Sequence, residues 1–107
     1  MTKRELQRNI RQVVEQIVRL AQPLQIILFG SAAKGAAGPD SDLDFLVVVP
    51  ENQRSSDVVD RLNTGVRPRP MPCDFLVVTP SVLKRNARTP GLVYAEILRS
   101  GREVYAG

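Results

Sequence analysis

The chain has 107 residues, of which 43% are hydrophobic and 24% charged, and its net charge is +4. This is the size and make-up of one ordinary globular domain, so we expect a single domain over residues 1–107. The absence of histidine excludes a histidine-based zinc site, and a lone cysteine excludes an internal disulfide. No apolar run reaches the ~18 residues of a membrane helix, and the first residues do not resemble a signal peptide. We therefore expect a cytoplasmic protein that does not associate with membranes.

The basic residues are spread over the chain, and we expect most of them to form solvated surfaces; the alternative is a polyanionic partner such as a triphosphate or RNA. With no tryptophan and few aromatic residues, direct nucleic-acid binding is not expected.

The first third of the chain predicts a helix, a strand and a glycine turn. Thr2 and Glu5 form a capping box that starts a helix, and Pro23 ends it. Its apolar face repeats at helical spacing over Leu6, Ile10, Val13, Ile17 and Leu20. Residues 24–29 are a short apolar run typical of a buried strand. A short helix is predicted to begin directly after Gly30, at Ser31, and to run over Ala32, Ala33 and Ala36.

The remainder alternates strands with helices. Residues 42–49 form the clearest strand, and a helix over about 57–64 is capped by one of Ser55, Ser56 or Asp57. The proline-rich segment 67–72 is extended and leads into a strand over 73–79. Ser81 caps a helix ending near residue 87, Thr89 and Pro90 open a last helix to Arg99, and residues 102–105 form an edge strand.

This alternation predicts an α/β fold with a small mixed sheet and flanking helices. If Gly30 and the acids at the start of the second strand serve one site, the first two strands must be antiparallel. The second and third strands are then parallel, and the helix over 57–64 is a right-handed crossover between them.

Three aspartates occupy strand starts, where acids are disfavoured. Asp42 and Asp44 are two residues apart, so their carboxylates project from one face, and Asp74 repeats the pattern on the next strand. At ~4 Å two such charges repel by about 4 kcal/mol at an effective dielectric of 20. A divalent cation relieves that repulsion, and oxygen ligands favour Mg²⁺ or Mn²⁺. The alternative is that each aspartate only caps a turn before its strand.

The pair Gly30-Ser31 lies between a buried strand and the predicted helix. Glycine allows close approach of a ligand to the backbone, and a helix N-terminus binds phosphate. The Ser31 hydroxyl and the mobile charge of Lys34 are further candidates for phosphate contacts. Taken alone, Gly30 could simply make a turn, Ser31 cap the helix and Lys34 remain a solvated surface lysine.

Together these residues form a more specific pattern. The sequence resembles the signature of the DNA polymerase β-like nucleotidyltransferase superfamily, because Gly30-Ser31 is followed after ten further residues by Asp42-Leu43-Asp44. The segments Leu28–Gly35 and Pro39–Asp44 are similar to its minimal nucleotidyltransferase (MNT) branch, in which arginine often replaces Lys34. The resemblance extends over nearly the whole chain, to Asp74 and the last helix.

The resemblance implies a magnesium-dependent transfer of AMP from ATP, with pyrophosphate leaving. Asp42, Asp44 and Asp74 would be the catalytic residues and would hold two Mg²⁺ ions, and Gly30, Ser31, Lys34 and Gly35 would bind the nucleotide. Asp74 would also take the proton of the acceptor hydroxyl.

The chain is too short for a separate acceptor domain, so a partner or a homodimer should supply that surface. MNT proteins resemble the antitoxins of toxin–antitoxin pairs, which implies AMPylation of a tyrosine on a HEPN-type ribonuclease toxin. Two alternatives stay open, namely an antitoxin that only sequesters its toxin and a transferase for a small molecule. The basic first helix and the apolar residues Leu92, Val93 and Ile97 of the last helix are the candidate docking faces.

Overall fold

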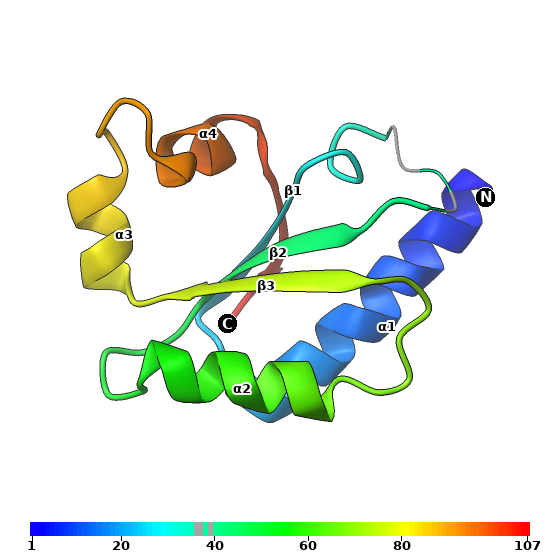
Figure 1. Ribbon diagram of the computed structural model, residues 1–107, viewed down its shortest axis with the longest axis horizontal. Coiled ribbons are helices and arrows are strands. Elements are labelled where there is room, and N and C mark those ends of the chain that lie inside the picture. Colours follow the sequence, from blue (N-terminus) through cyan, green and yellow to red (C-terminus); the bar gives the residue numbers. More distant parts are fainter. Residues whose placement is uncertain (36–37, 39) are drawn as a thin grey trace.

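The computed structural model of the protein describes residues 1–35, 38 and 40–107. It has a four-stranded sheet in the order β3-β2-β1-β4, with helices on both faces (Figure 1). The elements in chain order are α1 Lys3–Ala21, β1 Gln25–Phe29, β2 Leu43–Val48, α2 Ser55–Gly65, β3 Cys73–Val78, α3 Pro80–Asn86, α4 Val93–Ser100 and β4 Arg102–Ala106.

The strand pairing confirms the predicted mixed sheet. β1 is antiparallel to β2, and β2 is parallel to β3 through the crossover helix α2. The predicted last strand exists as β4, which pairs with β1 in antiparallel fashion and forms one edge of the sheet. The two strand starts that carry aspartates therefore lie at the same end of the sheet as the end of β1.

The main core lies between the sheet and the two long helices. Phe45 and Val47 point to this face and are fully buried, and so is Leu62 of α2. The amphipathic face of α1 packs here as predicted, with Leu6, Ile10, Val13 and Ile17 all buried. Burying each large apolar side chain contributes about 1.5–3 kcal/mol, so this face supplies most of the stability.

The opposite face carries a smaller core. Ile27, Leu46, Val48, Val78 and Ile97 are its buried members, the last from α4. α3 and α4 are short helices that cover only one end of this face (Figure 1).

Several predicted boundaries were wrong, and local chemistry explains each. α2 begins at Ser55 after Arg54, so none of the three predicted caps is used. α3 begins at Pro80 rather than at a Ser81 cap, because proline fits the first helical position and Glu51 accepts from the Ser81 N–H at 2.7 Å and from its hydroxyl. α4 begins only at Val93, because the left-handed φ of +84° at Gly91 interrupts a helix opened by Pro90.

Within the described residues, no helix is both long and apolar enough to cross a bilayer.

Candidate active site

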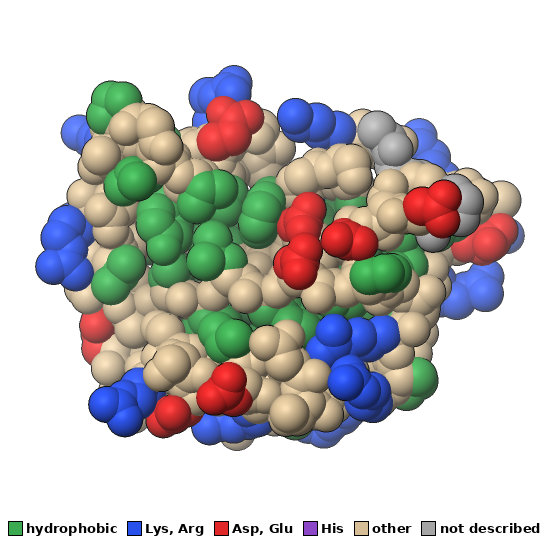
Figure 2. Space-filling view, viewed as in Figure 1, with side chains coloured by type: hydrophobic (Ala, Val, Ile, Leu, Met, Phe, Trp, Pro, Cys, Tyr) green, Lys and Arg blue, Asp and Glu red, His purple; other side chains and the backbone are tan. Residues whose placement is uncertain are grey.

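Two of the carboxylates, those of Asp44 and Asp74, lie side by side in one row across the sheet. Asp44 of β2 is paired with Asp74 on the parallel β3, and on its other side with Phe29 of β1. Asp42 precedes β2 by one residue and lies two residues before Asp44. Because side chains two apart in a strand project from the same face, we expect Asp42 on the face of Asp44. Figure 2 shows acidic side chains gathered beside a hydrophobic surface on this face. The fold therefore places Asp44 beside Asp74, with Asp42 near enough for its charge to act on Asp44.

Electrostatics at this row disfavour the charged form of Asp44. The pKa of its carboxyl is raised, first by burial, then by the negative charges of Asp74 and Asp42, and last by a hydrogen bond with Asp74. Like charges that share a site raise each other's cost of ionisation, and a bound cation removes that cost. Asp42 and Asp74 are themselves exposed, so the row is open to solvent.

The donor set fits a magnesium ion shared with a substrate. All the available ligands are carboxylate oxygens, which Mg²⁺ and Mn²⁺ prefer. Among the described residues, no three His, Cys, Asp or Glu side chains already form a group that could hold a metal by themselves. Mg²⁺ does not require such a cage, because it usually takes one or two carboxylates together with waters and substrate phosphates. The neighbouring pair Asp44 and Asp74 meets that requirement.

Gly30 lies directly against the carboxylates. It follows β1 with a φ of +75°, a conformation that glycine adopts without strain. A Cβ atom added at this position would collide with the Oδ2 atom of Asp44. The left-handed turn therefore favours glycine, and a side chain here would push the carboxylate of Asp44 aside, so the two halves of the sequence pattern lie in contact.

The predicted short helix after Gly30 is wrong. Residues 31–35 form successive turns, with the Lys34 N–H donating to the Ser31 carbonyl and the Gly35 N–H to that of Ala32. Gly35 has a φ of +71°, which is incompatible with a continuing right-handed helix. The part of that prediction that falls on residues 36 and 37 lies outside the described residues. A phosphate group at Ser31 would therefore meet turn N–H groups and not a helix N-terminus.

Lys34 is exposed and lies near α4. The pKa of Glu96 on that helix is lowered, chiefly by the hydrogen bond and charge of Arg99 and in smaller part by Lys34. Among the residues that the structure describes, none would contact a Cβ atom at Gly35, so packing against them does not account for that glycine.

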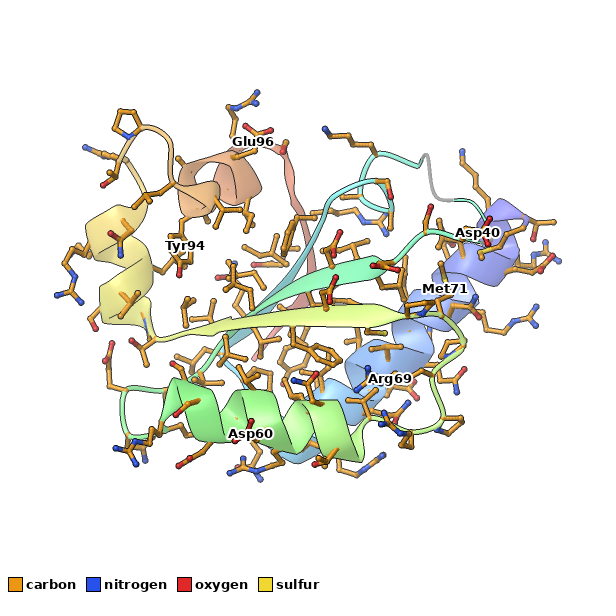
Figure 3. The ribbon with its side chains drawn as sticks, viewed as in Figure 1. Asp40, Asp60, Arg69, Met71, Tyr94 and Glu96 are labelled. Atoms are coloured by element: carbon orange, nitrogen blue, oxygen red, sulfur yellow. The ribbon has the colours of Figure 1, made fainter. Side chains whose placement is uncertain are left out.

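Sequence reasoning did not identify the residues that hold the start of β3. The side chain of Gln16 is buried in α1, donates to the Pro68 carbonyl at 3.0 Å and accepts from the Arg67 N–H at 2.7 Å. Arg69 donates to carbonyls at the end of α2 and lies 5.4 Å from the ring centroid of Phe75 (Figure 3). The sequence offered one indication of this role, namely that Arg67 and Arg69 lie in the extended segment just before Asp74.

Cys73, beside Asp74, is not a reactive thiol. It is buried and donates to the Met71 carbonyl at 3.3 Å. Burial is the largest cause that raises its pKa to about 11, so the thiol stays protonated at neutral pH.

The structure is thus a mixed α/β sheet with two paired carboxylates at its strand starts and a glycine turn against them. The profile of the nucleotidyltransferase domain family matches residues 8–103, so the chain belongs to that family. The family predicted from the signature is confirmed. No curated protein sequence matches the chain.

Two solved structures share the fold. One is a protein from Sulfolobus solfataricus provisionally described as a nucleotidyltransferase, with 21% identity, a TM-score of 0.55, and coverage of 76% of this chain and 73% of that one. The other is a toxin–antitoxin structure with AMP-PNP, with 17% identity, a TM-score of 0.55, and coverage of 91% of this chain and 73% of that one. At these identities the likeness establishes the fold.

Proposed function

We propose that the protein is a magnesium-dependent protein adenylyltransferase that transfers AMP from ATP to a hydroxyl of a partner toxin and so acts as an antitoxin. The observation that carries the proposal is the row in which Asp44 pairs with Asp74 while Gly30 packs against Asp44. Membership of the nucleotidyltransferase domain family supports the reaction class. The likeness to a toxin–antitoxin structure with a nucleotide analogue supports the biological setting.

The proposed roles follow from the positions of the side chains. Asp42, Asp44 and Asp74 hold Mg²⁺, with two ions expected, and Gly30 and Ser31 bind the triphosphate through the turn at residues 31–35. Lys34 and Gly35 complete the nucleotide-binding set, with Lys34 as a mobile cation. When bound, the metal neutralises the charge that develops on the phosphates and activates the acceptor hydroxyl.

In the proposed reaction the acceptor oxygen forms a bond to the α-phosphorus of ATP. The bond from that phosphorus to the oxygen bridging the α- and β-phosphates breaks, and pyrophosphate leaves. The proton of the acceptor hydroxyl passes to the exposed carboxylate of Asp74. Alignment of the acceptor and stabilisation of charge supply most of the rate.

The proposed partner is a HEPN-type ribonuclease toxin, with a tyrosine hydroxyl as acceptor. A homodimer of the antitoxin is a further expectation. Because ATP and Mg²⁺ are plentiful in the cytoplasm, we place the reaction there.

The test uses the double variant Asp42→Ala plus Asp44→Ala, with the partner toxin and ATP labelled at the α-phosphate. We expect the wild type to increase the mass of the toxin by AMP units and to relieve its toxicity, and the double variant to do neither. If the wild type adds no mass and the double variant still rescues poisoned cells, the protein is a sequestering antitoxin. If label passes to an aminoglycoside and not to protein, it is a small-molecule transferase.

A further inference from the structure

The apolar surface beside the carboxylates is the most prominent feature that the proposed chemistry does not use. It consists of Leu76, Val82, Leu83 and Tyr94, which we call the apolar shelf. All four are only partly buried, and all four pack on the smaller core. Figure 2 shows hydrophobic side chains gathered next to the acidic ones on this face, and Figure 3 shows Tyr94 reaching from α4 over the sheet.

The strand register places the shelf directly next to the acids. The row Asp74–Asp44–Phe29 is followed, two residues along each strand, by Leu76–Leu46–Ile27. Leu46 and Ile27 in this second row are buried, whereas Leu76 on the edge strand β3 stays partly open. The shelf therefore begins one strand repeat from Asp74.

The fold leaves an acceptor one side from which to approach. α1 and α2 close the other face of the sheet over fully buried residues such as Phe45. On the open face, Gly30 lies against Asp44 on the β1 side, which is the side that the proposed function assigns to the triphosphate. Asp74 and Leu76 lie on the β3 side, which remains for the acceptor.

We infer that the apolar shelf is the docking surface for the acceptor, and that it selects a protein segment presenting a hydroxyl among apolar side chains. This inference rests on the proposed function and assigns the surface that binds its acceptor. A sugar acceptor would require hydrogen-bond partners, and of the four shelf residues only Tyr94 has a polar side-chain atom. A tyrosine of the acceptor would bury its ring on the shelf and present its hydroxyl oxygen to Asp74.

A rival docking surface exists on the other side of the molecule. A groove of about 300 Å³ between α1 and β4 is lined by Gln7, Ile10, Arg11, Val14, Arg102 and Val104. Val14 and Val104 pack on the main core, so this groove belongs to the closed face. A protein held only there would not present a hydroxyl to the carboxylates, although an acidic segment would suit the two arginines.

The experiment compares substitutions in the apolar shelf with substitutions in the rival groove. Leu76→Asn and Leu83→Gln alter the shelf, and Val104→Asn alters a partly buried valine of the rival groove. Leu83 lies on α3, which has no buried residue, so its variant tests the shelf even if Leu76→Asn unfolds. Arg11→Glu tests the charge of the groove.

With labelled ATP and the partner toxin, we expect each shelf variant to raise KM for the toxin about tenfold while KM for ATP changes less than twofold. Val104→Asn and Arg11→Glu should change both constants less than twofold. A rise in KM for ATP would assign the shelf to the nucleotide base, and a toxin effect confined to the groove variants would assign docking there. Either result, or unchanged constants in both shelf variants, overturns the inference.

Binding of unlabelled toxin, measured by calorimetry without ATP, separates the two hypotheses. If the wild type transfers no AMP but Leu83→Gln still weakens toxin binding about tenfold, the proposed catalysis fails and the docking surface stands. If transfer occurs and neither shelf variant changes toxin binding or KM, the catalysis stands and the docking surface fails.

Discussion

The two faces of the sheet differ in how far they are covered. One face is closed by α1 and α2, helices of 19 and 11 residues, over side chains that are fully buried. The other is covered by α3 and α4, of 7 and 8 residues, which contribute Ile97 as their one buried side chain among the described residues. The closed face supplies stability, and the open face keeps three carboxylates and the apolar shelf accessible. A small domain can leave a site of mutually repelling charges exposed when its stability comes from elsewhere.

The largest expected effect is on the closed face. Phe45→Ala removes a fully buried ring and should lower the free energy of unfolding by about 3–5 kcal/mol. That is a large part of the ~5–15 kcal/mol available to a typical domain, and urea unfolding measures it. The control Leu98→Ala, on the open side at 43% exposure, should cost under ~0.5 kcal/mol. Equal losses in the two variants would contradict the division between the faces.

The next effect is on catalysis at the open face. Asp74→Asn keeps the shape of the side chain but removes its charge and its capacity as a base, so AMP transfer should fall about 10²–10⁴-fold. Circular dichroism should show the fold unchanged, because Asp74 is exposed. Asp60→Asn is the matched control, since that exposed carboxylate lies on α2 (Figure 3). Transfer within twofold of the wild type by Asp74→Asn would exclude the proposed role.

A smaller effect is expected at Gly30, which follows β1 and lies against Asp44. Gly30→Ala combines a left-handed φ with a collision against Asp44 and should cost about 1–3 kcal/mol of stability. Gly35→Ala has a similar φ of +71° but would meet none of the described residues, so it should cost only about 1 kcal/mol. The difference in melting temperature isolates the contact with Asp44. If Gly35→Ala costs as much as Gly30→Ala, that contact contributes nothing.

The smallest effect concerns pH. Because the pKa of Asp44 is raised in the folded protein, the native state binds more protons than the unfolded state at pH values just above the ordinary 3.8. Stability from this group is therefore present below that value and is lost as pH rises through the raised pKa. Asp44→Asn removes this loss of stability and should stabilise the metal-free protein at neutral pH by about 0.5 kcal/mol, a small value because the carboxylate is only partly buried and solvent screens its charge.

Melting curves of the wild type and Asp44→Asn over a range of pH measure this effect. We expect a gain of roughly 2–4 °C at neutral pH that disappears in acid. In the wild type, Mg²⁺ should reproduce part of the gain. A variant that melts below the wild type at neutral pH without metal would show that the carboxylates do not repel as argued.

The amino-acid sequence by itself determined the elements with strong local patterns. Three elements formed as predicted, namely α1 with its Thr2 cap, β2 and the strand β3 after the proline-rich segment. Each is specified by a pattern among residues close together in the sequence. The mixed sheet followed from the requirement that the glycine and the aspartates meet. The glycine and aspartate positions of the candidate site were also visible in the signature, but their roles remain proposals.

Only the tertiary structure decided which residues lie against one another. The pairing of Asp44 with Asp74, the contact of Gly30 with Asp44 and the shelf beside them depend on strand register and on packing between distant segments. The turn at residues 31–35 and the late start of α4 went against local helix signals, because glycines at positive φ end or delay those helices. The local sequence pattern predicts on which face of a helix or strand a side chain lies. Which residues pair across neighbouring strands depends on the register of the whole sheet.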